Sequence, residues 1–121
     1  MSRAHHNLIV WQQAIALVKA AYALSERFPQ SEIYGLTGQM RRAAISIPAN
    51  IAEGVGRNGA RDRIQFFVIA RGSLTELDTY IVLAREVAYA QNTAVIDEII
   101  DRVFGLIGGL INAERRKGAA G

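Results

Sequence analysis

The chain has 121 residues, no cysteine, and a formal charge of +3 from 14 basic and 11 acidic side chains. This length is typical of one domain that buries its own core, and the missing cysteines exclude disulfides and thiolate chemistry. Twelve of the 14 cations are Arg, which suits phosphate and carboxylate recognition better than Lys does, so nucleic-acid binding is permitted without being required.

The first predicted helix spans roughly residues 8–28. Its apolar residues recur at alternating spacings of three and four, which is typical of a helix, at Leu8, Trp11, Ile15, Val18 and Tyr22. A second apolar row lies beside the first, at Ala14, Leu17, Ala21 and Leu24. Because Pro29 disfavours helical geometry at Phe28, we expect the helix to end there.

The second predicted helix spans roughly residues 32–55 and contains a proline. One core row passes through it without a change of register, at Leu36, Met40, Ala44, Ile47, Ile51 and Val55. Pro48 lacks the N–H that would pair with the carbonyl of Ala44, so the pattern predicts a helix that is kinked rather than broken. Three glycines then offer non-helical backbone for the exit, at Gly54, Gly56 and Gly59.

Two further helices are predicted over residues 60–89 and 93–114. The third has a heptad-like row at Phe67, Ala70, Leu74, Leu77, Ile81, Ala84 and Ala88. The fourth has a row at Ile96, Ile99, Ile100, Val103, Ile107 and Leu110, with Asn92 or Thr93 as its N-cap. Gly105 and Gly109 suit close helix approach, and residues 118–121 are expected to fray.

Four helices with short connections predict an all-α fold, a single antiparallel up-and-down four-helix bundle over residues 1–121 with flexible ends. The helices carry more apolar surface than one narrow core can bury, as judged from Trp11, Tyr22, Phe66, Phe67 and Val82. A surplus apolar face is typical of a partner surface, so we expect homo-oligomerisation. The alternative is ordinary exposure of apolar residues, which is common.

Residues for catalysis or for cofactor and metal binding are scarce. The only histidines, His5 and His6, are adjacent and so do not share a helix face, and the Glu-x-x-His pairs of a di-iron bundle do not occur. The glycine-rich segments lack the order of a phosphate-binding loop. We therefore expect no enzyme, no cofactor and no metal. The first residues do not resemble a signal peptide, and the longest apolar segment is too short for a membrane span.

One polar constellation lines a face of the second helix, at Arg42, Ser46, Asn50, Glu53 and Arg57. The structural interpretation is that Arg42 and Glu53 pair with charges on the third helix, such as Glu76 or Asp78, or across a subunit interface. The functional interpretation is a basic rim that binds phosphates, formed by Arg41, Arg57, Arg61 and Arg63. The end of the chain adds Arg115, Arg116 and Lys117 to these cations. The structural interpretation of these three residues is that cations are favoured near the C-terminus of a helix by its dipole.

Three segments, NLIVWQQAIALV, FPQSEIYGLTGQMRRAAISIPANIAEGVGR and FFVIARGSLTELDTYIVLA, resemble the four-helix-bundle proteins encoded in intervening sequences of bacterial 23S rRNA genes. The resemblance covers about residues 7–90. It implies a cytoplasmic bacterial protein, an up-and-down bundle and a homopentameric ring. A related bundle is the accessory protein of the reverse transcriptase in diversity-generating retroelements, where it binds nucleic acid. For the family itself, association with the ribosome reflects gene location.

The chain departs from the pattern of that family at the start of the third helix. Gly59 and Asp62 replace a Ser and a Glu that form a capping box, at a cost of about a few tenths of a kcal/mol. Arg63 and Gln65 replace an aromatic residue and a cation, so the positive charge is redistributed. The family keeps SIPANIAEG as a unit, in which Ser46 and Asn50 flank the proline at a spacing that suits bonding to the carbonyls it frees.

Two functions from different classes follow. The first is a homo-oligomeric bundle that binds RNA or a ribonucleoprotein through an arginine-rich surface. The alternative is a protein-interaction scaffold that binds a partner protein and no nucleic acid.

Overall fold

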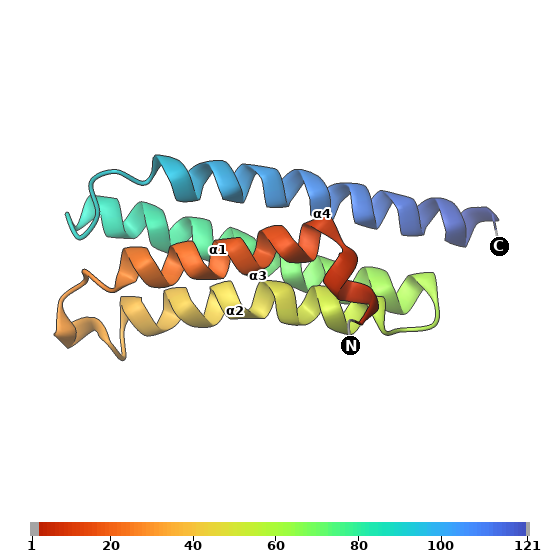
Figure 1. Cartoon of the computed structure of the whole chain (residues 1–121), viewed down its shortest axis with the longest axis horizontal. Coiled ribbons are helices and arrows are strands. Elements are labelled where there is room, and N and C mark those ends of the chain that lie inside the picture. The colour runs from red at the N-terminus through yellow and green to blue at the C-terminus, as the bar shows by residue number, and fades with distance from the viewer. Residues whose placement is uncertain (1–2, 121) are drawn as a thin grey trace.

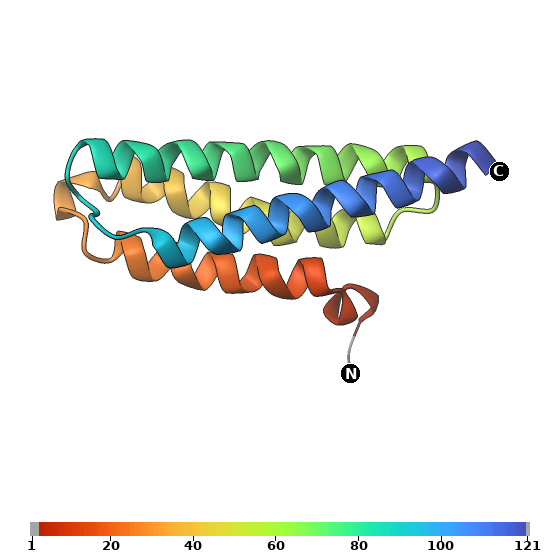
Figure 2. The same ribbon diagram turned by 90° about the horizontal axis from the view of Figure 1, so that it is seen from above.

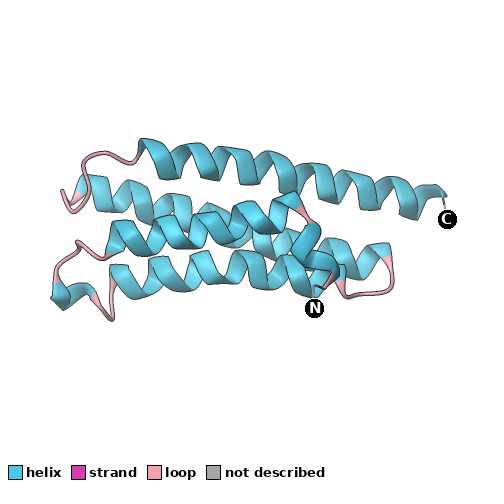
Figure 3. Ribbon diagram, in the orientation of Figure 1, coloured by secondary structure: helices cyan, strands magenta, loops and turns pink. Residues whose placement is uncertain are grey.

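The computed structural model describes residues 3–120. Within this range the chain forms four α-helices, α1 (Ile9–Ser25), α2 (Leu36–Val55), α3 (Ala60–Glu86) and α4 (Ala94–Ala120), together with the short 3-10 turns η1 (Ala4–Asn7) and η2 (Gln30–Glu32) and no strand (Figure 3). Successive helices run in opposite directions, as two perpendicular views show (Figures 1 and 2). Each helix packs against its neighbours in sequence, and α4 closes the bundle against α1. The predicted all-α up-and-down bundle is confirmed.

The core lies along the rows predicted for α2, α3 and α4. Side chains that are almost completely buried include Ile47 and Ile51 on α2, Leu74 on α3 and Ile107 on α4. Periodic apolar spacing predicts these faces correctly because each row recurs at intervals of three and four residues and so lies along one side of its helix.

The core face of α1 is the second of its two apolar rows. Ala14, Leu17 and Ala21 are fully buried, whereas Ile15 and Tyr22 on the other row are exposed. Small side chains at Ala14 and Ala21 let neighbouring helices approach closely, which explains why this row and not the bulkier one forms the core. The bulkier row is therefore part of the surplus apolar surface.

Helix α2 continues through Pro48, as its unbroken register predicts. Asn50 Nδ2 donates to the carbonyl of Ser46 at 2.8 Å and to its Oγ at 2.9 Å. This is not the carbonyl of Ala44, which is the one that loses its N–H partner at Pro48, so the expected bonding to the freed carbonyl is not found among the described residues. Ser46 Oγ is 2.8 Å from Ser73 Oγ and joins this turn of α2 to α3. The kink itself stays a prediction.

Gly54 brings α2 and α3 together, which is a steric role and not the conformational one expected. The residue is inside the helix, and no glycine of the described chain has a positive φ. A Cβ built on Gly54 would lie 2.5 Å from Cε1 of Phe67. Only a residue without a side chain therefore lets the Phe67 ring pack against this turn of α2.

Four helix boundaries differ by three or more residues from those predicted, and one of them is the start of α2, which begins at Leu36 rather than at residue 32. α1 ends at Ser25 rather than at Phe28, and α3 ends at Glu86 because Ala88 adopts a left-handed φ of 64°. The amides of Tyr89 and Ala90 then fold back onto the carbonyl of Ala84, which closes the helix in the manner of a Schellman motif. α4 continues to Ala120 instead of fraying from Gly118. The last predicted flexible residue, Gly121, lies outside the described residues, as do residues 1–2.

Side-chain hydrogen bonds fix the α1–α2 and α3–α4 connections. Glu32 accepts hydrogen bonds from the Leu36 amide at 3.1 Å and from the Tyr89 hydroxyl at 2.9 Å. These bonds lower the pKa of Glu32 below its usual 4.5, the amide bond contributing most, and the bond to Glu32 raises the pKa of Tyr89 above 10.0. Asn92 Oδ1 accepts from the Ala94 amide at 3.1 Å, so the expected cap of α4 is present.

Candidate nucleic-acid interface

Positive charge gathers where α2 ends, α3 begins and α4 ends. Residues 53–63 and 114–117, which we call the basic end, contain six cations and three carboxylates. Their net charge of +3 equals that of the whole chain, so the remainder is balanced. The two segments meet in space, because a Cβ on Gly118 would lie 3.5 Å from the Cβ of Ala60. α4 and the α2–α3 loop point in the same direction (Figure 1).

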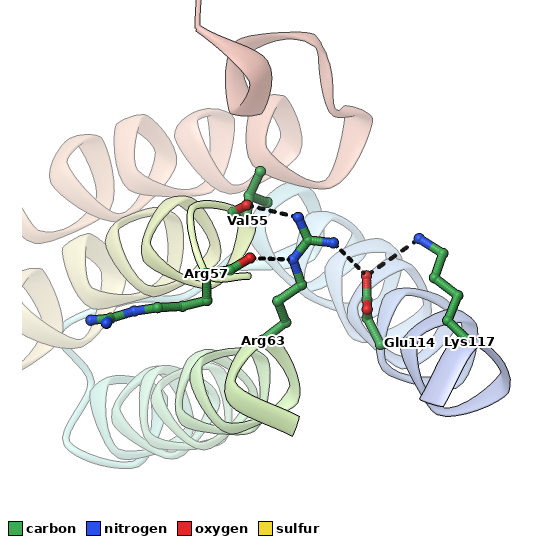
Figure 4. Close-up of polar contacts among 5 residues, drawn as sticks. All are labelled: Val55, Arg57, Arg63, Glu114 and Lys117. Atoms are coloured by element: carbon green, nitrogen blue, oxygen red, sulfur yellow. Dashed lines mark hydrogen bonds and ion pairs between the residues drawn. The ribbon is translucent and has the colours of Figure 1, made fainter. Parts of the chain in front are cut away.

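Arg63 holds the basic end together. Its Nε donates to the carbonyl of Arg57 at 2.8 Å, and its Nη2 donates to the carbonyl of Val55 at 3.1 Å. The carbonyl of Val55 belongs to the last residue of α2, where helical carbonyls lack intrahelical partners, and that of Arg57 belongs to the loop that follows. Nη1 of Arg63 donates to Oε1 of Glu114 on α4 at 3.3 Å (Figure 4). One guanidinium therefore links three helices.

Glu114 is a buried carboxylate whose charge is balanced locally. The residue is 5% exposed, and its Oε1 accepts from Arg63 and, at 3.5 Å, from Nζ of Lys117. Because a buried charge is costly unless it is paired and hydrogen-bonded, this arrangement ties Arg63 to the interior. Arg63 is thus a structural residue before it is a phosphate ligand.

Arg57 is partly occupied but remains at the surface. Its Nη2 lies 3.1 Å from Oε1 of Glu53, one turn earlier, in a solvent-exposed pair. Its guanidinium also lies over the ring of Phe66, 4.7 Å from the ring centroid. Exposed ion pairs of this kind contribute little energy, so a phosphate competes readily with Glu53 for this side chain.

The remaining cations of the basic end point outward. Arg61, Arg115 and Arg116 are exposed, and none makes a hydrogen bond or ion pair with another residue in the range that the structure describes. Arg61 is on the first turn of α3, and the other two are on the last turns of α4. Arg115 and Arg116 on α4 therefore lie on the same surface as Arg61 on α3. The residue spacing within either helix does not predict this proximity.

Arg41 lies at the other end of the bundle, so the expectation that it joins the same rim is wrong. Its Nε donates to Oγ of Ser25 at 2.9 Å, and its guanidinium lies 4.5 Å from the centroid of the Tyr22 ring. Arg41 and Arg57 are both on or next to α2, but the rise of a helix separates them by roughly 20 Å. Arg41 therefore lies beside the C-terminal end of α1, away from the basic end.

The polar face of α2 is a seam with α3 in its middle and a surface at its ends. Ser46 and Asn50 are partly buried against Ser73, whereas Arg42 and Glu53 are exposed. Glu53 pairs with Arg57 of its own helix. Within the described chain, Arg42 forms no ion pair with Glu76 or Asp78, and Glu53 forms none with a cation of α3, so that intrachain pairing is wrong.

Other site types find no support in the described part of the chain. Residues 3–120 contain no group of three or more His, Cys, Asp or Glu side chains placed to hold a metal ion. Likewise, none of the described helices combines the length and the apolarity that crossing a bilayer requires.

Comparison with known proteins agrees with the fold and with the motif in α2. The model of the family described as 23S rRNA-intervening sequence protein matches residues 6–109. The match includes Arg57, Arg61 and Arg63 and stops before the cations at the end of α4. No curated protein matches the chain. Because the matched residues make up most of its length, the chain belongs to the 23S rRNA-intervening sequence protein family.

Proposed function

We propose that this protein is a non-enzymatic, homo-oligomeric helical bundle that binds RNA through its basic end. The observation that carries the proposal is the concentration of the whole net charge of +3 in residues 53–63 and 114–117. We further propose that it acts in the bacterial cytoplasm as a ring of five copies, as its family resemblance implies.

The outward cations suit phosphates better than bases. Arg61, Arg115 and Arg116 present guanidinium groups on two different helices, with no intrachain partner among the described residues. A convex surface of separate guanidinium groups contacts the backbone of a nucleic acid and reads little of its sequence. Binding through such contacts is steeply salt-dependent and tolerant of sequence. In an oligomer each subunit repeats the surface, so a modest affinity per subunit is multiplied.

Self-association is supported by the apolar side chains on the outside of α3. Val68, Ile69, Val82 and Leu83 are all exposed on this helix, and a Cβ added to Gly72 between them would have no atom within 4 Å. Phe67, which the sequence suggests as part of this surplus, is in the core instead. Thr75, Glu76 and Thr79 are exposed between Val68 and Ile69 on one side and Val82 and Leu83 on the other. The apolar side chains therefore form two patches on the outside of α3, and exposed apolar patches are typical of an interface between subunits.

A second apolar surface lies on a different side of the molecule. The start of α1 and the second half of α4 form a shallow groove lined by Ile9, Gly105, Leu106 and Gly109, among others. Gly105 and Gly109 approach no helix of their own chain, since nothing lies within 4 Å of a Cβ at either position. Two different apolar faces on one chain suit head-to-tail contacts between copies, which close into a ring when the rotation permits.

Binding is tested with a triple variant of the outward cations. Arg61→Ala, Arg115→Ala and Arg116→Ala together remove charge and no intrachain bond. We expect RNA binding at low salt to fall by at least about tenfold while helicity and mass stay unchanged. The control is Arg102→Ala, which removes an exposed cation of α4 outside the basic end together with its hydrogen bond to Gln13. Equal RNA affinity in the triple variant and the wild type would contradict the proposal.

Assembly is tested by light scattering after size exclusion. The monomer has a mass of 13.2 kDa, and we expect a particle several times larger. Ile69→Lys with Val82→Lys should reduce the mass to that of the monomer without loss of helicity, because a charge on each outer turn of α3 opposes burial there. Val95→Lys, an exposed apolar position on α4, is the control. A wild-type monomer at micromolar concentration contradicts the assembly.

The alternative is a scaffold that binds a partner protein and no nucleic acid. One observation favours it: Arg57 and Arg63 both bond to carboxylates of their own chain. No RNA binding at low salt by an assembled wild-type protein would favour this alternative.

A further inference from the structure

Three aromatic rings form a cluster at the N-terminal turn, beside the basic end. The centroids of the His5 and His6 rings are 4.5 Å apart, and those of His5 and His6 lie 5.2 and 5.1 Å from the Trp11 ring. All three side chains are half-buried, so each retains ring surface that solvent reaches. Trp11 also packs against the core, whereas none of the Arg63 hydrogen bonds involves the three rings.

Hydrogen bonds hold the cluster in place. The amide of Arg3 donates to Nδ1 of His6 at 3.0 Å, and the amide of His6 donates to the carbonyl of Arg3 at 2.9 Å. Nε2 of Gln12 on α1 donates to the carbonyl of His6 at 2.8 Å. η1 also packs against α2, near the turn that carries Val55 (Figure 4). The rings are therefore ordered before any ligand binds.

Ordered aromatic rings next to cations suit unpaired nucleobases. Bases of a single strand stack on such rings while the adjacent cations contact the phosphates, and stacking tolerates any sequence because every base has a π-face. A duplex offers the same phosphates but keeps its base faces inside the helix. A metal site is the competing use of two histidines, but the described residues supply no third ligand.

We infer that His5, His6 and Trp11 form a stacking platform for unpaired bases, and that the nucleic acid bound at the basic end is single-stranded. This inference rests on the proposed RNA binding. It adds the class of ligand, because charge alone does not distinguish a single strand from a duplex. Bases of RNA and DNA share the stacking chemistry, so the experiment includes both.

The test uses Trp11 as its own reporter, since it is the only tryptophan of the chain. Its fluorescence is titrated, at one salt concentration, with an unstructured RNA strand of about 16 nucleotides, the upper size of one such site. The same strand in a duplex and inorganic polyphosphate supply phosphates without accessible bases. We expect the single strand to quench the emission and the two controls to bind without quenching. A DNA strand of the same sequence is titrated in the same way. Equal quenching by DNA and RNA would show that the platform recognises the bases alone, whereas quenching by RNA only would show that the ribose is contacted as well.

Affinities of variants, measured with labelled RNA, separate stacking from charge. We expect Trp11→Leu to reduce the preference for the single strand over the duplex by about tenfold, the order of magnitude of one stacked base. Tyr22→Leu is the matched control, because Tyr22 is an exposed aromatic residue of the same helix at its far end. The preference of the Tyr22→Leu variant for the single strand over the duplex should equal that of the wild type.

The outcomes keep this inference apart from the function on which it rests. Salt-sensitive binding of single strand and duplex with equal affinity, without quenching, would overturn the platform and leave the basic end intact. Absence of binding to any nucleic acid would overturn both. An equal loss of preference in Trp11→Leu and Tyr22→Leu would also overturn the platform, since only one of the two residues belongs to it.

Discussion

Replacing Arg63 with alanine removes three hydrogen bonds that join α3 to α2 and α4. Hydrogen bonds of charged groups contribute about 1.5–3 kcal/mol each, but the full sum does not apply. The Arg63 side chain is 31% exposed, so water replaces part of the bonding to the carbonyls of Val55 and Arg57. Glu114 keeps Lys117 as a partner while it remains buried. We therefore expect the free energy of unfolding to fall by about 2–3 kcal/mol.

Urea unfolding followed by circular dichroism, at one protein concentration, measures this loss. The control is Arg61→Ala, which removes an outward arginine two positions away and should change stability by less than about 0.5 kcal/mol. Adding Glu114→Gln to Arg63→Ala should restore part of the loss, because a neutral amide leaves no buried charge unpaired. A similar small effect for Arg63→Ala and Arg61→Ala would refute the assignment of Arg63 as the residue that links the helices.

Three further changes test the packing and the loops. Gly54→Ala should destabilise the protein by about 1–3 kcal/mol in urea unfolding, because the added Cβ would clash with the ring of Phe67. Gly108→Ala, whose Cβ would have no atom within 4 Å, should stabilise the protein by up to about 1 kcal/mol. The reverse order would contradict the steric role of Gly54. Pro48→Ala should keep the helical circular dichroism but weaken assembly in light scattering, because the kink predicted at Pro48 sets the shape of α2 and thereby of the bundle. An unchanged mass and subunit affinity would contradict this role of Pro48. Because the pKa of Glu32 is lowered on folding, its contribution to stability is present above pH 4.5 and is lost as pH falls below that value. Glu32→Gln should therefore reduce the pH dependence of the free energy of unfolding on the acid side, and an unchanged dependence would contradict the role of this carboxylate. The pKa of Tyr89 is raised on folding, so its contribution to stability is present below pH 10.0 and is lost at higher pH.

The sequence predicts the bundle well because each core face is set by local periodicity. It predicts α1 less well, since Ile15 and Ala14 both lie on apolar rows and only packing distances decide between them. The end of α3 is missed because Ala88 continues the apolar row while its backbone leaves the helix. At Ala88 the apolar spacing of a helix continues although the backbone is no longer helical. Because alanine rarely adopts a positive φ, the sequence does not indicate that the helix ends here.

The candidate site depends on contacts between segments far apart in the chain. Arg63 and Glu114 are 51 positions apart, and the spacing of residues within each helix does not predict which side chains of α3 and α4 meet. The error over Arg41 has a simpler cause, because arginines at the two ends of one helix are not neighbours in space when several turns separate them. Arg57 and Arg61 are correctly predicted to lie together because a short loop connects their helices.

The salt dependence of RNA binding tests the central claim most directly. Association constants are measured at several salt concentrations for the assembled wild type and for the variant that lacks Arg61, Arg115 and Arg116. For a single strand each phosphate contact contributes about −0.7 to the slope of log K against log salt. Phosphate binding by the basic end predicts a slope shallower by about 2 or more in the variant. Identical slopes in two proteins of equal mass would contradict it.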